Sequence, residues 1–138
     1  MIDTDIQLSF VLPVGNQGGS VQAFVRGLIA EADGLDETYE IVLVTDGSSD
    51  ETEAVLRQLA DDYRCVRILE LSRPFGADVA VTAGVEAAGG EVVITFDRRC
   101  DNWTALLGQL LAARRDGAEV AEAASNATKW NMLAGVDR

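Results

Sequence analysis

Apolar runs and amphipathic segments alternate along the chain, which predicts strands and helices in turn. Four apolar runs have the length of a buried strand, and each is followed by a segment whose apolar residues recur every three or four positions. The runs predict strands at about residues 6–14, 39–45, 66–71 and 91–96, and the later segments predict helices at about 20–32, 50–63, 76–88 and 102–115. Repeated strand–helix units predict an α/β fold with a mostly parallel sheet and helices on both faces. We expect one domain spanning residues 1–138.

The last part of the chain has a weaker pattern. A short final strand is predicted at about residues 119–121, after Gly117. The run Lys129-Trp130-Asn131-Met132-Leu133 predicts a terminal amphipathic turn that docks on a neighbouring surface.

The carboxyl end of the second strand carries the most informative polar residues. The apolar run of residues 41–44 ends in Thr45, which is followed by Asp46-Gly47-Ser48-Ser49-Asp50. In open α/β sheets ligands bind outside the carboxyl ends of the strands, so Asp46 is placed to accept hydrogen bonds from a base or a ribose. A tight turn followed by a helix cap is the alternative interpretation, with Glu53 in capping-box register behind Asp50.

Composition and charge exclude several functional classes. The 138 residues are 48% hydrophobic, no apolar run has the length of a membrane span, and no signal-peptide pattern precedes the first strand, so we expect a cytoplasmic protein. The net charge of −12 repels nucleic acid and anionic membrane. Cys65 and Cys100 are isolated and the chain has no histidine, which argues against a zinc site, a disulfide framework and a histidine base.

Four segments resemble motifs of the family-2 inverting glycosyltransferases, enzymes with the GT-A fold that include the polyprenyl-phosphate mannose and glucose synthases. The segments occur in the family's order and cover about residues 6–121. They are Ser9–Gln17, similar to the family's Val-Ile-Pro-x-Tyr-Asn-Glu; Tyr39–Thr52, similar to its Tyr-Glu-Ile through Asp-Asp-Gly-Ser; Leu71–Gly84, similar to its Leu-Ser-Arg-Asn-Phe-Gly and Ala-x-x-Ala-Gly; and Val92–Asp97, which leads toward its Asp-x-Asp. The resemblance implies the nucleotide-binding half of a GT-A domain.

The same resemblance implies roles for individual residues. Pro13 and Asp46 would hold the base of a UDP- or GDP-linked sugar, and Asp97 would lie near the ribose. Arg73 and Gly76 would lie close to the nucleotide or its phosphates. Gly84 would be a packing residue.

The chain also departs from the family pattern. Gly15, Gln17 and Thr45 replace the family's Tyr, Glu and first Asp, and Arg99 replaces the metal-binding second Asp of Asp-x-Asp. A guanidinium cannot coordinate a cation, so magnesium or manganese is disfavoured and no cofactor is expected. Arg98 and Arg99 form either a solvated surface pair or, in the sharper hypothesis, a substitute for the metal in which a planar guanidinium hydrogen-bonds directly to the oxygens of a diphosphate. Asp101 predicts a helix cap or, alternatively, a displaced metal carboxylate.

Two functional hypotheses follow. The first is a degenerate glycosyltransferase domain that has lost or weakened catalysis and acts as a binding or assembly module, because no catalytic base is identifiable in the sequence. The second is an active glycosyltransferase subunit completed by a partner or a second copy. An unrelated nucleotide-binding α/β domain is a third, weaker alternative. Because the family's acceptor-binding half has no counterpart in the sequence, we expect exposed apolar surface and association with a second copy or a partner protein.

Overall fold

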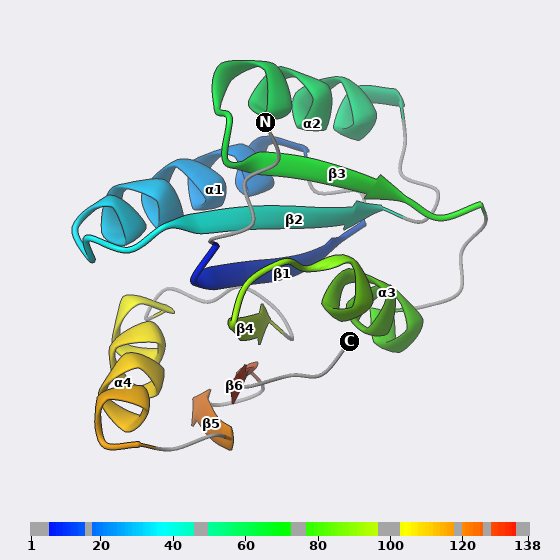
Figure 1. Cartoon of the computed structure of the whole chain (residues 1–138). Coiled ribbons are helices and arrows are strands. Elements are labelled where there is room, and N and C mark those ends of the chain that lie inside the picture. The colour runs from blue at the N-terminus through cyan, green and yellow to red at the C-terminus, as the bar shows by residue number, and fades with distance from the viewer. Residues whose placement is uncertain are drawn as a thin grey trace.

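The computed structural model describes residues 6–15, 18–45, 50–72, 77–96, 103–117, 120–125 and 128–134. Strands and helices alternate up to residue 125, as the sequence pattern predicts, and a further strand follows without a helix between (Figure 1). The elements are β1 (Leu8–Val14), α1 (Gly18–Asp33), β2 (Tyr39–Thr45), α2 (Asp50–Asp62), β3 (Val66–Glu70), α3 (Ala77–Ala87), β4 (Val92–Phe96), α4 (Trp103–Arg115), β5 (Val120–Ser125) and β6 (Thr128–Ala134). None of the helices in the described part of the chain is long and apolar enough to cross a membrane.

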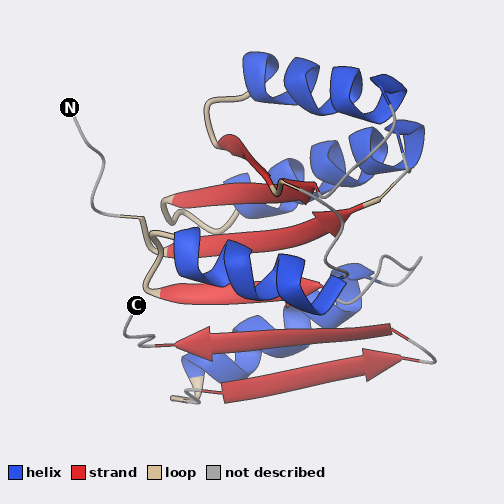
Figure 2. Cartoon of the chain, turned by 90° about the vertical axis from the view of Figure 1, so that its right-hand side faces the viewer, coloured by secondary structure: helices blue, strands red, loops and turns tan. Residues whose placement is uncertain are grey.

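The strands form one mixed sheet in the order β3-β2-β1-β4-β6-β5. The first four are parallel to one another, while β6 pairs antiparallel with β4, and β5 pairs antiparallel with β6 (Figure 2). The predicted mostly parallel α/β fold is therefore confirmed.

The carboxyl-terminal prediction is wrong in one respect. The run containing Lys129–Leu133 is not a terminal turn but the centre of β6, and the preceding strand is longer than expected. The register pairs Thr95 with Asn131 and Phe96 with Trp130. The backbone N–H and C=O groups of residues 130–134 pair with the edge of β4 that β1 leaves free. This pairing stabilises the segment as a strand.

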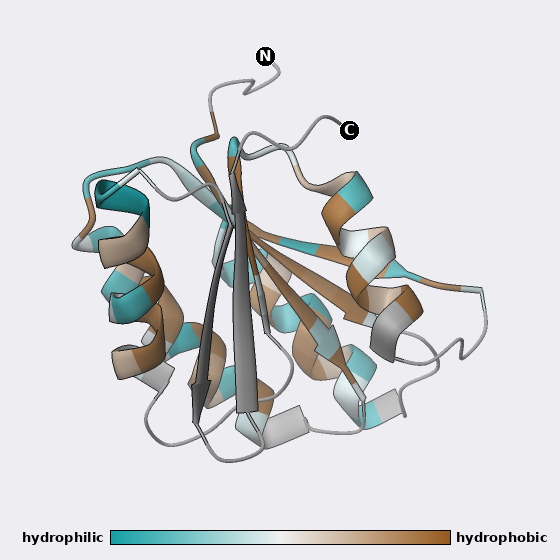
Figure 3. Cartoon of the chain, turned by 90° about the horizontal axis from the view of Figure 1, so that it is seen from below, coloured by the Kyte–Doolittle hydropathy of each residue, from teal (hydrophilic) through white to brown (hydrophobic). Residues whose placement is uncertain are grey.

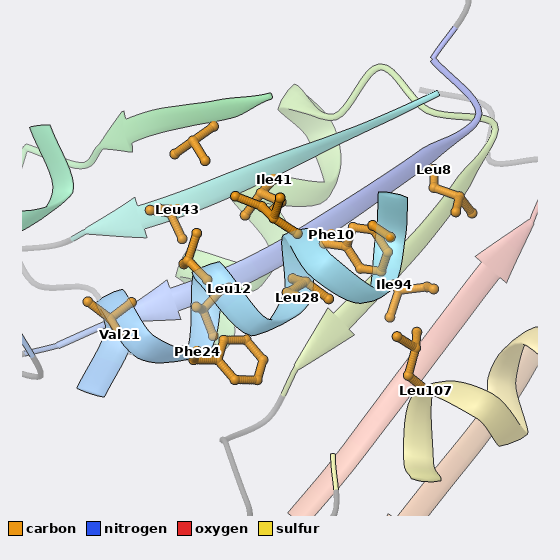
Figure 4. Close-up of a cluster of buried hydrophobic side chains, with 14 of the residues drawn as sticks. Leu8, Phe10, Leu12, Val21, Phe24, Leu28, Ile41, Leu43, Ile94 and Leu107 are labelled. Carbon is orange, nitrogen blue, oxygen red and sulfur yellow. The ribbon is translucent and has the colours of Figure 1, made fainter. Parts of the chain in front are cut away.

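Alternation along the central strands divides the core between the two faces of the sheet. Phe10, Leu12, Ile41 and Leu43 belong to the larger buried cluster, which α1, α2 and α4 cover. Figure 4 shows these side chains facing Leu28 and Phe24 of α1. The intervening residues form the smaller cluster under α3, so the strands are apolar on both faces, as parallel sheets require (Figure 3). The members of this smaller cluster are Val11, Val42, Val44, Ala80, Ala88 and Val93.

A buried polar network fixes the amino-terminal edge of the sheet. The Glu40 carboxylate of β2 is only 5% exposed and accepts hydrogen bonds from Ser9 Oγ at 2.6 Å and from the Gly89 N–H at 2.6 Å. Arg67 Nε of β3 donates to its other oxygen at 3.0 Å. The second guanidinium arm also donates to the Ala87 carbonyl at 2.8 Å. One carboxylate thereby links three strands to the turn between α3 and β4.

Candidate functional site

The carboxyl-terminal edge of the parallel strands is where the sequence places the site. Val14 and Thr45, the last residues of β1 and β2, are register partners, and β4 runs parallel to β1 on its other side. The three strands therefore end at the same edge of the sheet. In open α/β sheets, ligands bind outside the carboxyl ends of the strands, which makes this edge the candidate site.

Of the six predicted nucleotide-binding residues, the structure describes Pro13. It lies near the end of β1, is partly exposed, and is the register partner of Val44 in β2. The other five lie outside the described residues, so their roles stay predictions. They are Asp46, Arg73, Gly76, Asp97 and Arg99, and Asp46 and Asp97 directly follow the last residues of β2 and β4 in the sequence.

The end of β2 is tied to α2 by a side-chain contact that the sequence did not predict. Thr45 is 1% exposed, and its Oγ1 donates a hydrogen bond to Glu53 Oε1 at 3.1 Å. The second carboxylate oxygen, Oε2, is buried and has no hydrogen-bond partner among the described residues. The Thr45 carbonyl accepts a hydrogen bond from the Leu71 N–H at 2.8 Å, just beyond β3. Thr45 is therefore held on two sides.

Helix α3 lies unusually close to the strands beneath it, which supports the packing role expected for Gly84. A Cβ on Gly84 would clash with Val11 Cγ1 of β1 and would lie 2.9 Å from Val44 Cγ2 of β2. Only a glycine permits this approach without rearrangement. Because α3 begins at Ala77, directly after the segment containing Arg73 and Gly76, the contact fixes the element that follows the predicted phosphate-binding residues.

The opposite, amino-terminal edge of the sheet has a hollow of about 520 Å³. Burial raises the pKa of the Tyr39 phenol, and the hydrogen bond that it donates to Asp33 Oδ1 at 2.7 Å raises it further. Burial also raises the pKa of the Cys65 thiol. Both shifts favour the neutral forms, so this edge shows no activated nucleophile. The lining residues are Ile6, Tyr39, Glu40, Arg64, Cys65, Arg67, Ala87 and Gly89.

A metal centre is not evident in the part of the chain that the structure describes. Within those segments no three histidine, cysteine, aspartate or glutamate side chains come together as a set that could hold an ion. The carboxylate of Asp97 lies outside them.

Comparison with known sequences identifies relatives among glycosyltransferases. An uncharacterized glycosyltransferase of Synechocystis sp. is 36% identical over 118 residues, covering 83% of this chain and 36% of the relative. The undecaprenyl-phosphate 4-deoxy-4-formamido-L-arabinose transferase of Aeromonas hydrophila is 36% identical over 123 residues, covering 87% of this chain and 37% of the relative. The chain thus spans little more than a third of the length of these relatives.

Solved structures share the fold at lower sequence identity. TarS from S. aureus, residues 1–349, superposes with a TM-score of 0.56 at 16% identity, over 83% of this chain and 34% of TarS. Glucosyl-3-phosphoglycerate synthase from Mycobacterium tuberculosis, solved with Mn²⁺, UDP and phosphoglyceric acid, superposes with a TM-score of 0.55 at 24% identity, over 77% of this chain and 39% of the synthase. These similarities show a GT-A-type fold.

The sequence model described as Glycosyl transferase family 2 matches residues 9–102. That range runs from β1 to the segment preceding α4, and it includes the strand ends that form the predicted site. The chain belongs to glycosyl transferase family 2.

Proposed function

We propose that this chain binds a nucleotide-sugar at the carboxyl-terminal edge of β1, β2 and β4. The observation that carries the proposal is the family match over residues 9–102. It is combined with the parallel arrangement of β1, β2 and β4, whose last residues lie at one edge of the sheet, next in sequence to the predicted binding residues. Fold neighbours were solved with such ligands: TarS with UDP-GlcNAc, and a Pyrobaculum calidifontis mannosyltransferase (TM-score 0.51) with GDP-Man and Mn²⁺.

The proposed binding mode assigns one part of the ligand to each segment of the edge. Pro13 and Asp46 hold the base, because Pro13 pairs with Val44, two residues before Asp46. Asp97, after β4, accepts from the ribose. Arg73 and Gly76, before α3, lie at the phosphates, where an N–H-rich helix start and a guanidinium favour negative charge.

The residues that would receive a divalent cation do not fit one. Asp97 is a suitable oxygen ligand, but Arg99 stands where the family has its second carboxylate, and a fixed positive charge repels Mg²⁺ or Mn²⁺. We therefore assign Arg99 to the diphosphate, which its planar fork matches in geometry. With Arg99 in place of the second carboxylate and no recognisable base in the sequence, the chain acts as a binding or assembly module with lost or weakened catalysis.

The proposal is tested by calorimetric titration with UDP, GDP and CDP and their sugars, with and without Mn²⁺. We expect metal-independent binding of a UDP- or GDP-sugar, and a loss of about tenfold or more in affinity for Arg99→Ala, since a charge-assisted contact contributes ~1.5–3 kcal/mol. Arg57→Ala, on the exposed face of α2, is the matched control and should leave the affinity unchanged. Binding that requires Mn²⁺, or no binding across the panel, contradicts the proposal.

A second candidate is an active glycosyltransferase subunit. The observation that favours it is that relatives of about 36% identity are named transferases. In this candidate, the acceptor-binding groups are supplied by a partner or a second copy. The name of the Aeromonas relative suggests undecaprenyl phosphate as acceptor class. The test is to express the chain together with a partner protein and to measure sugar transfer from UDP- or GDP-sugars to undecaprenyl phosphate. Transfer would support the active-subunit candidate.

We also propose that the chain associates with a second copy or a partner. The face carrying α3 has one helix among the described elements, whereas three helices cover the other face (Figure 3). Val79 of α3 is 45% exposed. A single monomeric species in light scattering at tens of micromolar would contradict self-association.

A further inference from the structure

We propose that the hollow at the amino-terminal edge of the sheet binds a small aromatic carboxylate. This site is separate from the proposed nucleotide-sugar edge, and the inference does not rest on that function. All eight lining residues lie within the described segments. The volume of about 520 Å³ falls in the usual range of small-molecule sites, about 300–1,000 Å³.

Arg67 of β3 presents a fixed guanidinium at the wall of this hollow. Its Nε donates to Glu40 Oε1 at 3.0 Å, and its Nη2 donates to the Ala87 carbonyl at 2.8 Å. Its third nitrogen, Nη1, donates to none of the described residues, and the side chain is 50% exposed. Because the two bonded nitrogens fix the plane of the guanidinium, an anion can bind Nη1 with little loss of side-chain entropy.

Arg64 supplies a second cation, and this one is unpaired. It is exposed in the turn between α2 and β3, and its side chain makes no ion pair or hydrogen bond with any described residue. The one carboxylate among the lining residues is Glu40, whose two oxygens already accept hydrogen bonds from Arg67, Ser9 and the Gly89 N–H. Two guanidiniums and one carboxylate leave the lining with a net charge of +1, in a chain whose net charge is −12.

This local charge favours a singly charged anion over a doubly charged one. A carboxylate carries one negative charge at pH 7 and balances the lining, whereas a phosphate monoester carries about −1.5 to −2. The second phosphate charge would be unbalanced beside the Glu40 carboxylate, where like charges repel. A planar carboxylate also matches the geometry of a guanidinium.

The apolar part of the hollow suits an aromatic ring. The Tyr39 ring is held by an edge-to-face contact with Phe10, at a centroid distance of 6.2 Å, and by the 2.7 Å hydrogen bond from its hydroxyl to Asp33. Asp33 itself does not line the hollow, whereas Ile6 and Ala87 do. A flat aromatic acid can therefore place its ring against these groups and its carboxylate at the two arginines.

The experiment is a titration with cinnamate, followed by the backbone amide NMR signals of the labelled chain. The signals of Cys65 and Gly89 report the hollow, and those of Val14 and Thr45 report the opposite edge. We expect saturable shifts of Cys65 and Gly89 with a Kd of about 1 mM, as for a ligand of this size. Cinnamamide, which is neutral, and phenyl phosphate, which carries more charge, should each bind more weakly than cinnamate.

Arg64→Gln tests the contact directly. Because Arg64 is exposed and unpaired among the described residues, this substitution should leave the Tm unchanged while it weakens cinnamate binding about tenfold, the effect of losing one charge-assisted contact. Arg26→Gln is the matched control. Arg26 is an exposed cation of α1 that does not line the hollow, so its replacement should change neither the Tm nor the affinity.

The outcomes also separate this inference from the proposed function. Saturating UDP-GlcNAc should leave the cinnamate affinity unchanged, and a chain that binds cinnamate but no nucleotide-sugar supports this site while contradicting the other. The inference is overturned if Cys65 and Gly89 do not shift with up to about 10 mM cinnamate. It is also overturned if cinnamamide or phenyl phosphate binds as well as cinnamate, if only Val14 and Thr45 shift, or if Arg64→Gln and Arg26→Gln have equal effects.

Discussion

The Ser9 hydroxyl of β1 donates a 2.6 Å hydrogen bond to the Glu40 carboxylate of β2, and the same hydroxyl accepts one from the Gly90 N–H at 2.8 Å. Ser9 is fully buried, so both contacts form away from water. Gly90 has no room for a side chain, because a Cβ there would lie 2.6 Å from Ser9 Oγ and 2.8 Å from its backbone nitrogen. The amino-terminal edge of the sheet is therefore closed by a specific polar contact.

Replacing Glu40 should destabilise the fold strongly. Glu40→Ala removes the acceptor of the buried Ser9 hydroxyl and the carboxylate partner of Arg67, which keeps its hydrogen bond to the Ala87 carbonyl. Removing one member of a buried ion pair costs about 3–5 kcal/mol. Because the Arg67 side chain is 50% exposed, we expect the lower part of that range, about 3 kcal/mol, in the free energy of unfolding measured with urea.

The control for Glu40 is the exposed pair between Arg57 and Glu70. These side chains are 70% and 57% exposed and lie 3.9 Å apart. Glu70→Ala should change the free energy of unfolding by less than about 0.5 kcal/mol. Equal losses for Glu40→Ala and Glu70→Ala would show that the buried network does not stabilise the sheet.

Gly84→Ala should separate α3 from the sheet. The added methyl meets Val11 and Val44 on two adjacent strands, and overpacking of this kind costs about 1–3 kcal/mol. Urea unfolding measures the loss. If the segment directly before α3 binds the phosphates as proposed, the nucleotide affinity of Gly84→Ala should fall together with its stability.

Gly108→Ala in α4 is the opposite case. Gly108 is exposed within the helix, and a Cβ there meets nothing within 4 Å. Alanine should therefore stabilise the protein by about 0.5–1 kcal/mol through helix propensity alone. A loss of stability at Gly108, or a gain at Gly84, would contradict the packing described here.

Stability should fall at alkaline pH because of Tyr39. Its pKa in the folded protein is raised above the ordinary value of 10.0, mainly by burial. Above pH 10 the unfolded chain loses this proton and the folded protein keeps it, so the stabilisation is complete below pH 10 and declines as the pH rises further. Tyr39→Phe should flatten the decline measured by urea unfolding between pH 9 and pH 11. An unchanged slope would rule out this cause.

The Cys65 thiol should be slow to react. Burial raises its pKa above 9.0, and the thiolate is the reactive form. In a Cys100→Ser background, alkylation by iodoacetamide at pH 8 should be at least about tenfold slower in the folded protein than in urea. Similar rates in both states would contradict the burial of Cys65.

The periodicity of the sequence was sufficient for the parallel part of the fold. Continuous apolar runs such as residues 41–44 are buried on both faces, and repeated strand–helix units give the parallel direction of the first four strands. The order of the strands in the sheet was not predicted. The Lys129–Leu133 run was misinterpreted because five residues with apolar positions two and three apart fit both a turn and a strand. Its conformation depends on pairing with β4, more than thirty residues earlier in the chain.

The candidate site likewise has features that the sequence predicted and one contact that it did not. The family motif selects Gly84 as a packing residue, and the structure confirms its close packing. The strand ends, as a ligand site, stay a prediction. The Thr45–Glu53 contact was not predicted, because local spacing assigns Glu53 to the helix start and no sequence rule gives a side chain's partner across a loop. The roles of Asp46, Arg73, Gly76, Asp97 and Arg99 remain predictions.

The Glu40 network has a consequence for how this family can diverge. Glu40 lies five residues before Thr45 on β2, about 16 Å away along an extended strand. This buried polar network is therefore remote from the edge that is proposed to bind the nucleotide-sugar. Substitutions such as threonine for aspartate at position 45, or arginine for aspartate at position 99, leave that network intact. Residues at the proposed nucleotide-sugar edge can therefore change while the buried contacts at the opposite edge are retained.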